Sequence, residues 1–402
     1  MTTPYRSMLA PTPINLSSRD HQDMIHIVGL YKCGTSWLLH MLAAHPQVVG
    51  WREFDVLRAT YARDSSLLAL PRTALDYLNP RVEDSGWMHR QEAFSLRKAD
   101  AIFREMFLGR GWVPVMGLKK QQRASALTPR NLDAMLEELL AIGDYRVRPA
   151  SAPPIDPRSC TNRLGVQSFR RDDLLTLMEA VRDTPEPLQI PKLFFESLRS
   201  QVVPGSRIAT KAADQLLQLS ALKAASPGSR VIAIVRDGRD ATVSAKHFEA
   251  LMRKREAPWR THHASFARRI LGWSLRAAKL AEHARRGDIT VLRYEDLHSN
   301  FAETSRALFL DLGLDGSVEV IDRVESTTNF SAVTDGRQPG EASEHQIRQG
   351  RVGEWEAALT TSQKRLAWRL AGKSLEAFGY TPSGQVEPSP LVLGNASDLS
   401  VI

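Results

Sequence analysis

A lysine, a glycine and two hydroxyl residues follow an apolar stretch near the start of the chain. Lys32 comes two positions before Gly34, and Thr35 and Ser36 follow directly. An apolar strand, a tight loop and an apolar helix in this order suit phosphate, because the first turn of a helix offers unpaired N–H groups and a positive dipole end. In nucleoside triphosphate loops the lysine follows the second glycine, as in G-x-x-x-x-G-K-[ST]. The different order here predicts an anionic nucleotide other than ATP or GTP.

A second anion site is indicated after a later apolar run. Arg236 follows residues 231–235, and Ser244 lies eight positions further on, about two turns into the next expected helix. An arginine fork and a serine hydroxyl together suit a second phosphate group. The alternative is a surface arginine and an ordinary helical serine, since arginine is common at strand ends.

A third candidate is the segment 348–355, Arg-Gln-Gly-Arg-Val-Gly-Glu-Trp. Two glycines three positions apart, flanked by arginines, favour a loop that wraps an anion with backbone N–H groups. The alternative is a plain basic loop. Residues 290–297 end a strand with Tyr294, Glu295 and Asp296, and for the two acids helix capping is the simpler interpretation.

The apolar patterns place these segments at one edge of a sheet. Strands that alternate with helices predict an α/β fold of three layers, α/β/α, around a mostly parallel sheet, with ligands bound at the carboxyl ends of the strands. We expect strands at 24–29, 207–210, 231–235 and 289–292, and helices at 35–45, 97–110, 132–142, 171–183, 240–255, 264–285, 300–312 and 363–378.

One large domain is expected, residues 23–382. Residues 1–22 are polar and predict a mobile arm, and the Pro, Gly and Ser content predicts a disordered tail over 383–402. Between the first and second strands lies a long, mostly helical insertion, residues 56–200, which is a natural place for a substrate lid.

The composition favours anionic ligands and argues against several other classes. There are 53 basic and 45 acidic residues, a net charge of +8, without a basic run interleaved with aromatics that would indicate nucleic-acid binding. Cys33 and Cys160 cannot build a disulfide framework, and no spacing is typical of a metal site. No segment has the length of a transmembrane helix or the pattern of a signal peptide. We therefore expect a cytoplasmic protein without metal, nucleic acid or membrane partners, and the oligomeric state stays open.

Together and in this order, the segments resemble the sulfotransferases that use 3′-phosphoadenosine 5′-phosphosulfate (PAPS). Residues 31–37, Tyr-Lys-Cys-Gly-Thr-Ser-Trp, look like that family's phosphosulfate loop, Pro-Lys-Ser-Gly-Thr-Thr-Trp. Residues 236–248 look like its 3′-phosphate segment, with Arg and Ser at the family spacing. Residues 294–297 are similar to its Tyr-Glu-Asp strand end, and residues 348–355 resemble its late Arg-Lys-Gly-x-x-Gly-Asp-Trp loop. The resemblance implies PAPS as the sulfuryl donor and no metal.

The resemblance also implies a role for each matching residue. The 5′-phosphosulfate would be held by Lys32, Gly34, Thr35 and Ser36. The 3′-phosphate would be held by Arg236, Ser244, Arg348, Gln349 and Gly350. The adenine would be contacted by Trp37 and Tyr294, with Thr328 or Phe330 lining the same pocket. The departures are Tyr31 for Pro, Cys33 for Ser and Gln349 for Lys, and Arg351 offers a replacement for the lost charge.

Two carboxylates are candidates for the base that takes the proton of the attacking hydroxyl. In the cytosolic small-molecule branch a histidine stands 22 positions before the 3′-phosphate arginine, and the same count here reaches Asp214. The segment Ala-Thr-Lys-Ala-Ala-Asp looks more like that of the carbohydrate and tyrosyl-protein branches, whose base is a glutamate. Glu53 stands where the resemblance would put that glutamate, and its neighbours Trp51 and Phe54 would raise its pKa.

We therefore expect Glu53 as the base and Asp214 as the alternative, although Glu53 could merely pair with Arg52 or cap a helix. Lys32 and Lys211 would be the cations on the transferring group. The expected reaction is in-line transfer to a hydroxyl of a small-molecule, natural-product or carbohydrate acceptor. The alternatives are a kinase-like nucleotide-binding enzyme with an aberrant phosphate loop, which would require Mg²⁺, and a catalytically silent nucleotide-binding scaffold.

Overall fold

The computed structural model describes residues 23–51, 151–158, 170, 173, 176, 189–254, 265–334, 336–338 and 350–393. Within these residues five strands form one parallel sheet in the order β2-β3-β1-β4-β5. They are β1 (Met24–Gly29), β2 (Val48–Trp51), β3 (Arg207–Lys211), β4 (Arg230–Val235) and β5 (Thr290–Arg293). Because all of them run the same way, their carboxyl ends meet at one edge, where ligands bind in such sheets.

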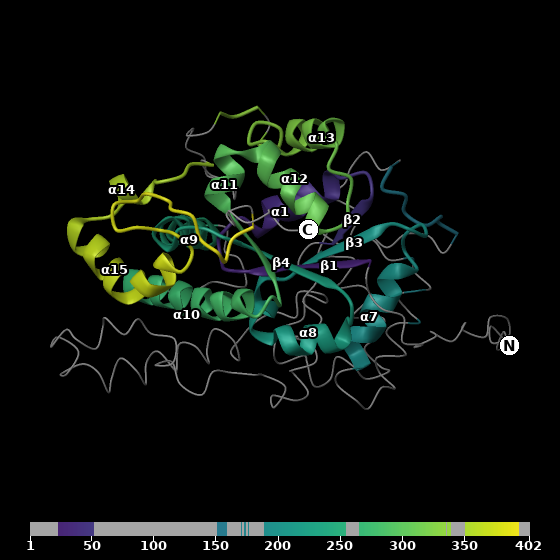
Figure 1. Ribbon diagram of the computed structural model, residues 1–402, viewed down its shortest axis with the longest axis horizontal. Helices are drawn as coiled ribbons and strands as arrows, with labels where there is room; N and C mark the ends of the chain where they lie inside the picture. The colour runs from purple at the N-terminus through teal and green to yellow at the C-terminus, as the bar shows by residue number, and fades with distance from the viewer. Residues whose placement is uncertain are drawn as a thin grey trace, which may run out of the picture.

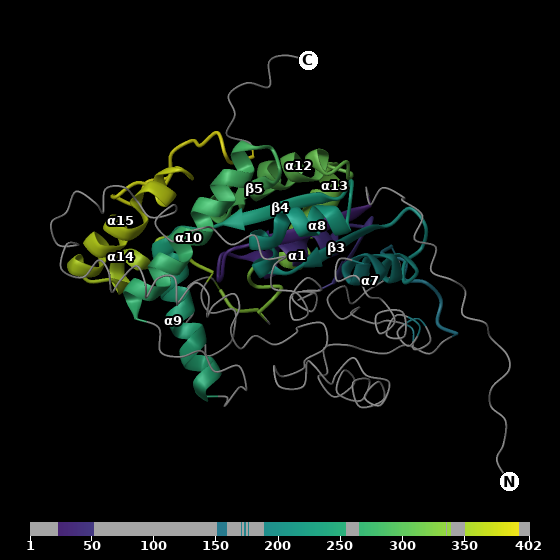
Figure 2. The ribbon, with the colours of Figure 1, turned by 90° about the horizontal axis from the view of Figure 1, so that it is seen from below.

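Helices cover both faces of the sheet because its strands are apolar on both sides. In β1, Met24 and Val28 belong to one core, and Ile25 and Ile27 belong to the other. The first core also takes side chains from α7 (Gln189–Arg199), α8 (Leu219–Ala225), α10 (Phe266–Arg285) and α15 (Thr361–Glu376), and the second from α1 (Thr35–Ala44), α12 (Phe301–Asp311) and α13 (Val318–Thr328). Figure 1 shows α12 and α13 above the sheet and α8 and α10 below it, and Figure 2 shows the latter pair from their own side. The predicted three-layer α/β/α fold is confirmed.

The remaining elements lie mostly near the carboxyl edge. They are η7 (Ala213–Gln218), α9 (Gly238–Lys254), α11 (Tyr294–Ser299) and α14 (Trp355–Ala358). Asp237 caps α9, because its Oδ1 accepts the backbone N–H of Arg239 at 2.8 Å. The predicted strands, and the predicted helices that fall in the described ranges, are present with small differences at their ends.

One strand, β2, was not predicted, and its presence changes the place of the long insertion in the order of the strands. β2 is only four residues long and contains Gly50, a poor strand former. A Cβ at Gly50 would lie 3.0 Å from that of Ala43 and 3.2 Å from the Leu39 side chain, so the glycine lets α1 pack closely on β2. The long insertion therefore separates the second strand from the third, rather than the first from the second.

The C-terminal segment is a second correction. The composition predicted disorder from residue 383, but the described part, up to residue 393, packs on the sheet. Val392 is buried, and the N–H of Leu393 donates to the carbonyl of Val291 in β5 at 2.8 Å. A few buried apolar and hydroxyl side chains outweigh the segment's loop-like composition. Residues 1–22, 394–402 and most of 56–200, with the helices expected at 97–110 and 132–142 and most of that at 171–183, lie outside the described residues.

Candidate functional site

The loop between β1 and α1 turns through two left-handed residues. Lys32 has a φ of 62° and Gly34 a φ of 100°. Gly34 also faces a ring, because a Cβ there would lie 2.8 Å from Tyr294. Gly34, the N-cap residue of α1, has no side chain that could cap the helix. Its first N–H groups are therefore available to an anion held in the loop.

Three cations meet at this edge of the sheet. Lys211 ends β3 and is buried, and Arg236 follows β4 and is also buried. Nζ of Lys32 lies 4.2 Å from the centroid of the Phe248 ring. Burial, with repulsion from Lys211 and Arg236, lowers the pKa of Lys32 to about 8. Cations that disfavour one another's charge are stabilised by an anion between them, so this arrangement fits a polyanion.

Arg236 is held by the protein through one nitrogen and lacks a partner at another. Nη2 donates to the carbonyl oxygen of Arg351 at 2.5 Å, and its guanidinium carbon lies 4.6 Å from the centroid of the Tyr294 ring. Nε is buried and has no hydrogen-bond partner among the described residues. A buried N–H without an acceptor is costly, and a phosphate oxygen would satisfy it.

An aromatic wall lies between the loop and Arg236. Trp37 and Tyr294 pack edge to face, with ring centroids 5.3 Å apart. Nε1 of Trp37 donates to the carbonyl of Thr328 at 3.0 Å, and the Thr328 hydroxyl donates to the carbonyl of Val324 at 2.7 Å. Three of the residues assigned to the adenine pocket are therefore neighbours in the fold.

The fourth, Phe330, contacts the loop of residues 350–355, which we call the late loop. Gly350 has a φ of 60°, and a Cβ there would lie 2.4 Å from the Phe330 ring, so only glycine fits. The carbonyl of Gly350 lies 2.9 Å from Nε2 of His298, which ties the loop to α11. The guanidinium carbon of Arg337 lies 5.4 Å from the Phe330 centroid.

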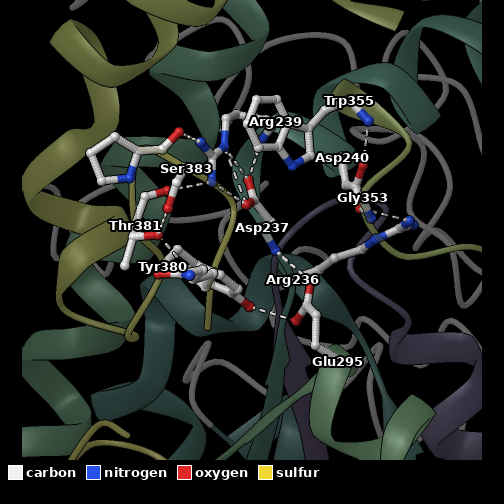
Figure 3. A network of polar contacts seen from close by, with 12 residues as sticks. Arg236, Asp237, Arg239, Asp240, Glu295, Gly353, Trp355, Tyr380, Thr381 and Ser383 are labelled. Atoms are coloured by element: carbon white, nitrogen blue, oxygen red, sulfur yellow. Dashed lines mark hydrogen bonds and ion pairs between the residues drawn. The ribbon is translucent and has the colours of Figure 1, made fainter. Parts of the chain in front are cut away.

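A second charged cluster, centred on Arg239, lies beside Arg236 (Figure 3). Arg239 is 2% exposed, and its Nη2 lies 2.6 Å from Oδ2 of Asp237. It also donates to the carbonyls of Thr381 and Pro382 at 2.9 and 3.1 Å, and its guanidinium carbon lies 3.6 Å from the centroid of Trp355. This cation is satisfied within the protein.

Glu295 completes that cluster. It accepts the backbone N–H of Asp237 at 3.1 Å and the hydroxyl of Tyr380 at 2.8 Å. Burial raises the pKa of Glu295 to about 7, although these hydrogen bonds and Arg236 oppose the shift. Glu295 thus links α11 to the start of α9 and to Tyr380, just beyond α15, which goes further than the capping role that its position suggested.

The other predicted residues have varied surroundings. Thr35 is buried and Ser36 is exposed in the first turn of α1, and Ser244 is half-buried in α9. Asp214 lies in η7, just beyond β3, and its side chain is not among the described ones. Three predicted residues lie outside the described residues: Glu53, Arg348 and Gln349.

Sequence reasoning missed Phe248 and His298 as parts of the site. Phe248 stands four residues after Ser244, so helical spacing puts both on one face of α9 and could have indicated it. Nothing in the sequence pattern pairs His298 with a loop 52 positions later.

The described residues hold no group of three or more His, Cys, Asp or Glu that could bind a metal ion. None of the helices seen in the described ranges is long and apolar enough to cross a membrane.

Comparison with known proteins gives one family and several distant structures. A model of the Sulfotransferase family matches residues 24–317. No curated protein matches the sequence significantly. Mouse sulfotransferase SULT7A1 complexed with PAP is 20% identical, with a TM-score of 0.34, over 51% of this chain and 79% of that chain. Retinol dehydratase in a complex with retinol and PAP is 14% identical, with a TM-score of 0.39, over 88% of this chain and 82% of that chain. Sulfotransferase STF9 from Mycobacterium avium is 13% identical, with a TM-score of 0.41, over 92% of this chain and 80% of that chain.

Proposed function

Because the chain belongs to the Sulfotransferase family, we propose that it transfers a sulfuryl group from PAPS to a hydroxyl group of an acceptor. The observation that carries this proposal is the meeting of Lys32, Lys211 and Arg236 at the carboxyl edge of the sheet, where the other two cations help to lower the pKa of Lys32 to about 8. PAPS carries a phosphosulfate and a separate 3′-phosphate. Among the described residues these match a helix start without a capping side chain and the buried Nε of Arg236, which has no acceptor there.

The chemistry assigned to the residues is positioning and charge stabilisation. The donor supplies a bond between sulfur and an oxygen of its 5′-phosphate. A base takes the proton of the acceptor hydroxyl, the acceptor oxygen bonds to sulfur, and the bond from sulfur to the phosphate oxygen breaks with its electrons left on that oxygen. Lys32 and Lys211 stabilise the charge that develops there.

We propose Glu53 as the base, with Asp214 as the alternative. Glu53 follows the last residue of β2, Trp51, by two positions, and Trp51 is paired with Thr210, next to Lys211. This register supports the choice of Glu53, because β2 ends beside the strand that carries Lys211. We expect Glu53→Gln to remove turnover while Asp214→Asn keeps it, and the reverse result would assign the base to Asp214.

The acceptor is proposed to be a small-molecule, natural-product or carbohydrate alcohol. The long segment 56–200, which none of the phosphate-binding motifs uses, is proposed to supply the acceptor pocket. A cytoplasmic location is part of the same proposal, and the buried free thiol of Cys33 supports a reducing compartment.

The direct test is incubation with PAPS and a library of alcohols and glycans, followed by mass spectrometry. We expect one acceptor class to gain the mass of one sulfuryl group in the presence of a chelator. Calorimetry with 3′,5′-adenosine bisphosphate is the companion measurement, and no binding there would remove the proposal. Turnover of ATP that a chelator abolishes would favour the kinase-like alternative.

A further inference from the structure

Asp240, in the first turn of α9, is a buried carboxylate that touches both Arg236 and the late loop (Figure 3). Its Oδ1 accepts the backbone N–H of Trp355 at 2.8 Å, and its Oδ2 accepts that of Gly353 at 2.8 Å. Oδ2 also lies 3.4 Å from Nη2 of Arg236. One carboxylate therefore receives three donors from two segments more than a hundred positions apart.

The late loop thus wraps an anion that belongs to the chain itself. The sequence predicted that the glycines of residues 348–355 would turn N–H groups toward a ligand. In the structure Gly353, with a φ of 76°, turns its N–H toward Asp240 instead. The N–H groups of Gly353 and Trp355 are therefore taken by Asp240 and are not available to a bound phosphate.

The same contacts orient Arg236. Its Nη2 lies between Asp240 and the carbonyl of Arg351, so the loop and the carboxylate hold the same corner of the guanidinium. Because the guanidinium is planar and is joined to its side chain at Nε, holding Nη2 restrains the direction in which the remaining N–H groups point. The buried Nε is one of these and has no acceptor among the described residues.

We propose that Asp240 is the positioning residue of the 3′-phosphate subsite, where it fixes Arg236 and the loop of residues 350–355 in one arrangement. This inference rests on the proposed function. It assigns Asp240 to nucleotide binding through other groups, without contact to the reacting atoms.

The test compares two nucleotides that differ only in the 3′-phosphate. Binding of 3′,5′-adenosine bisphosphate and of 5′-AMP is measured by calorimetry for the full-length wild type and Asp240→Asn. The asparagine amide turns an N–H group toward at least one of the three donors. We expect affinity for the bisphosphate to fall about 10- to 100-fold and affinity for 5′-AMP to stay within about twofold.

Glu249→Gln is the matched control. Glu249 is another buried carboxylate of α9, paired with Arg269 at 2.6 Å, away from Arg236. Its variant should lose thermal stability without a change in the ratio of the two affinities. Should Asp240→Asn fail to fold, Asp240→Glu keeps the charge, displaces the carboxylate by one methylene, and should lower the same ratio.

An unchanged ratio in the Asp240 variants, or an equal loss for both nucleotides, would overturn the inference. Wild-type protein that binds neither nucleotide would overturn the proposed function, which is a distinct result.

Discussion

The cluster around Arg239 and the cluster around Lys32 differ in how their charges are balanced. Arg239 has a carboxylate at 2.6 Å, two carbonyl acceptors and an aromatic face. Lys32 has an aromatic ring at 4.2 Å, and its pKa is lowered by burial and by two further cations. The first cluster is satisfied internally, which is typical of a residue that holds the fold together. The second is improved by an external anion, which is typical of a binding site.

The largest expected effect is on turnover. Lys32→Met should lower turnover about 10³-fold, because the charge on the departing phosphate oxygen loses its nearest cation. The free energy of unfolding should not fall, since the repulsion among the three cations is relieved. Initial rates and chemical denaturation measure the two quantities, with Lys373→Met, on the exposed surface of α15, as the control. A Lys32 variant that loses stability and keeps turnover would show that Lys32 holds the fold together and does not serve a binding site.

The opposite pattern is expected for Arg239. Arg239→Met should lower the free energy of unfolding by about 3–5 kcal/mol, because the carboxylate of Asp237 is left buried and unpaired. Chemical denaturation checks this value. The control is Arg286→Met, which removes a 60% exposed partner of Glu282 and should cost at most about 1 kcal/mol. Equal losses of unfolding free energy in the two variants would show that burial of the ion pair does not determine its contribution to stability.

Glu295, in the cluster around Arg239, makes the stability of the folded protein depend on pH. Its pKa is about 7 in the folded protein, against an ordinary value of 4.5, so the folded state binds the extra proton. The stability that this gives is present below pH 4.5 and is lost as pH rises through 7. Glu295→Gln should remove the dependence, so wild type should lose up to roughly 3 kcal/mol relative to the variant between pH 4.5 and 8. Denaturation curves across this range test it, and parallel pH profiles would contradict it.

The smallest effect expected is in nucleotide binding. Above pH 8 the free protein loses the proton of Lys32, and binding of a polyanion must restore it. Affinity for 3′,5′-adenosine bisphosphate should fall roughly tenfold between pH 7 and pH 9. Calorimetry in buffers of different ionisation enthalpy should show proton uptake. Lys32→Arg stays charged and should lose this dependence, and an unchanged profile in that variant would assign it to another group.

Local patterns were sufficient for four of the five strands in the described part of the sheet. The uninterrupted apolar runs at β1 and β4 predicted buried parallel strands, and the residues that follow them form the cation cluster. The strand β2 was missed because Val48–Trp51 is short and contains a glycine whose purpose, close packing of α1, is visible only in three dimensions.

The partners of charged residues were harder to predict. The sequence shows Asp237, Arg239 and Asp240 as a single charged stretch. Which of them supports Arg236 depends on residues 351–382. That segment supplies the carbonyl groups that bind Arg236 and Arg239 and the N–H group that binds Asp240. Backbone groups carry no side-chain signature, so no pattern in the sequence identifies them as partners.

The distance along the chain between these partners has a consequence for biosynthesis. Arg236 and Arg239 leave the ribosome 115 and 142 positions before the carbonyls of Arg351 and Thr381 that they contact. Until those residues emerge, burial of either guanidinium would lack these acceptors, so the nascent sheet cannot close around them. The proposed nucleotide site would therefore be completed only after residues 351–381 have left the ribosome.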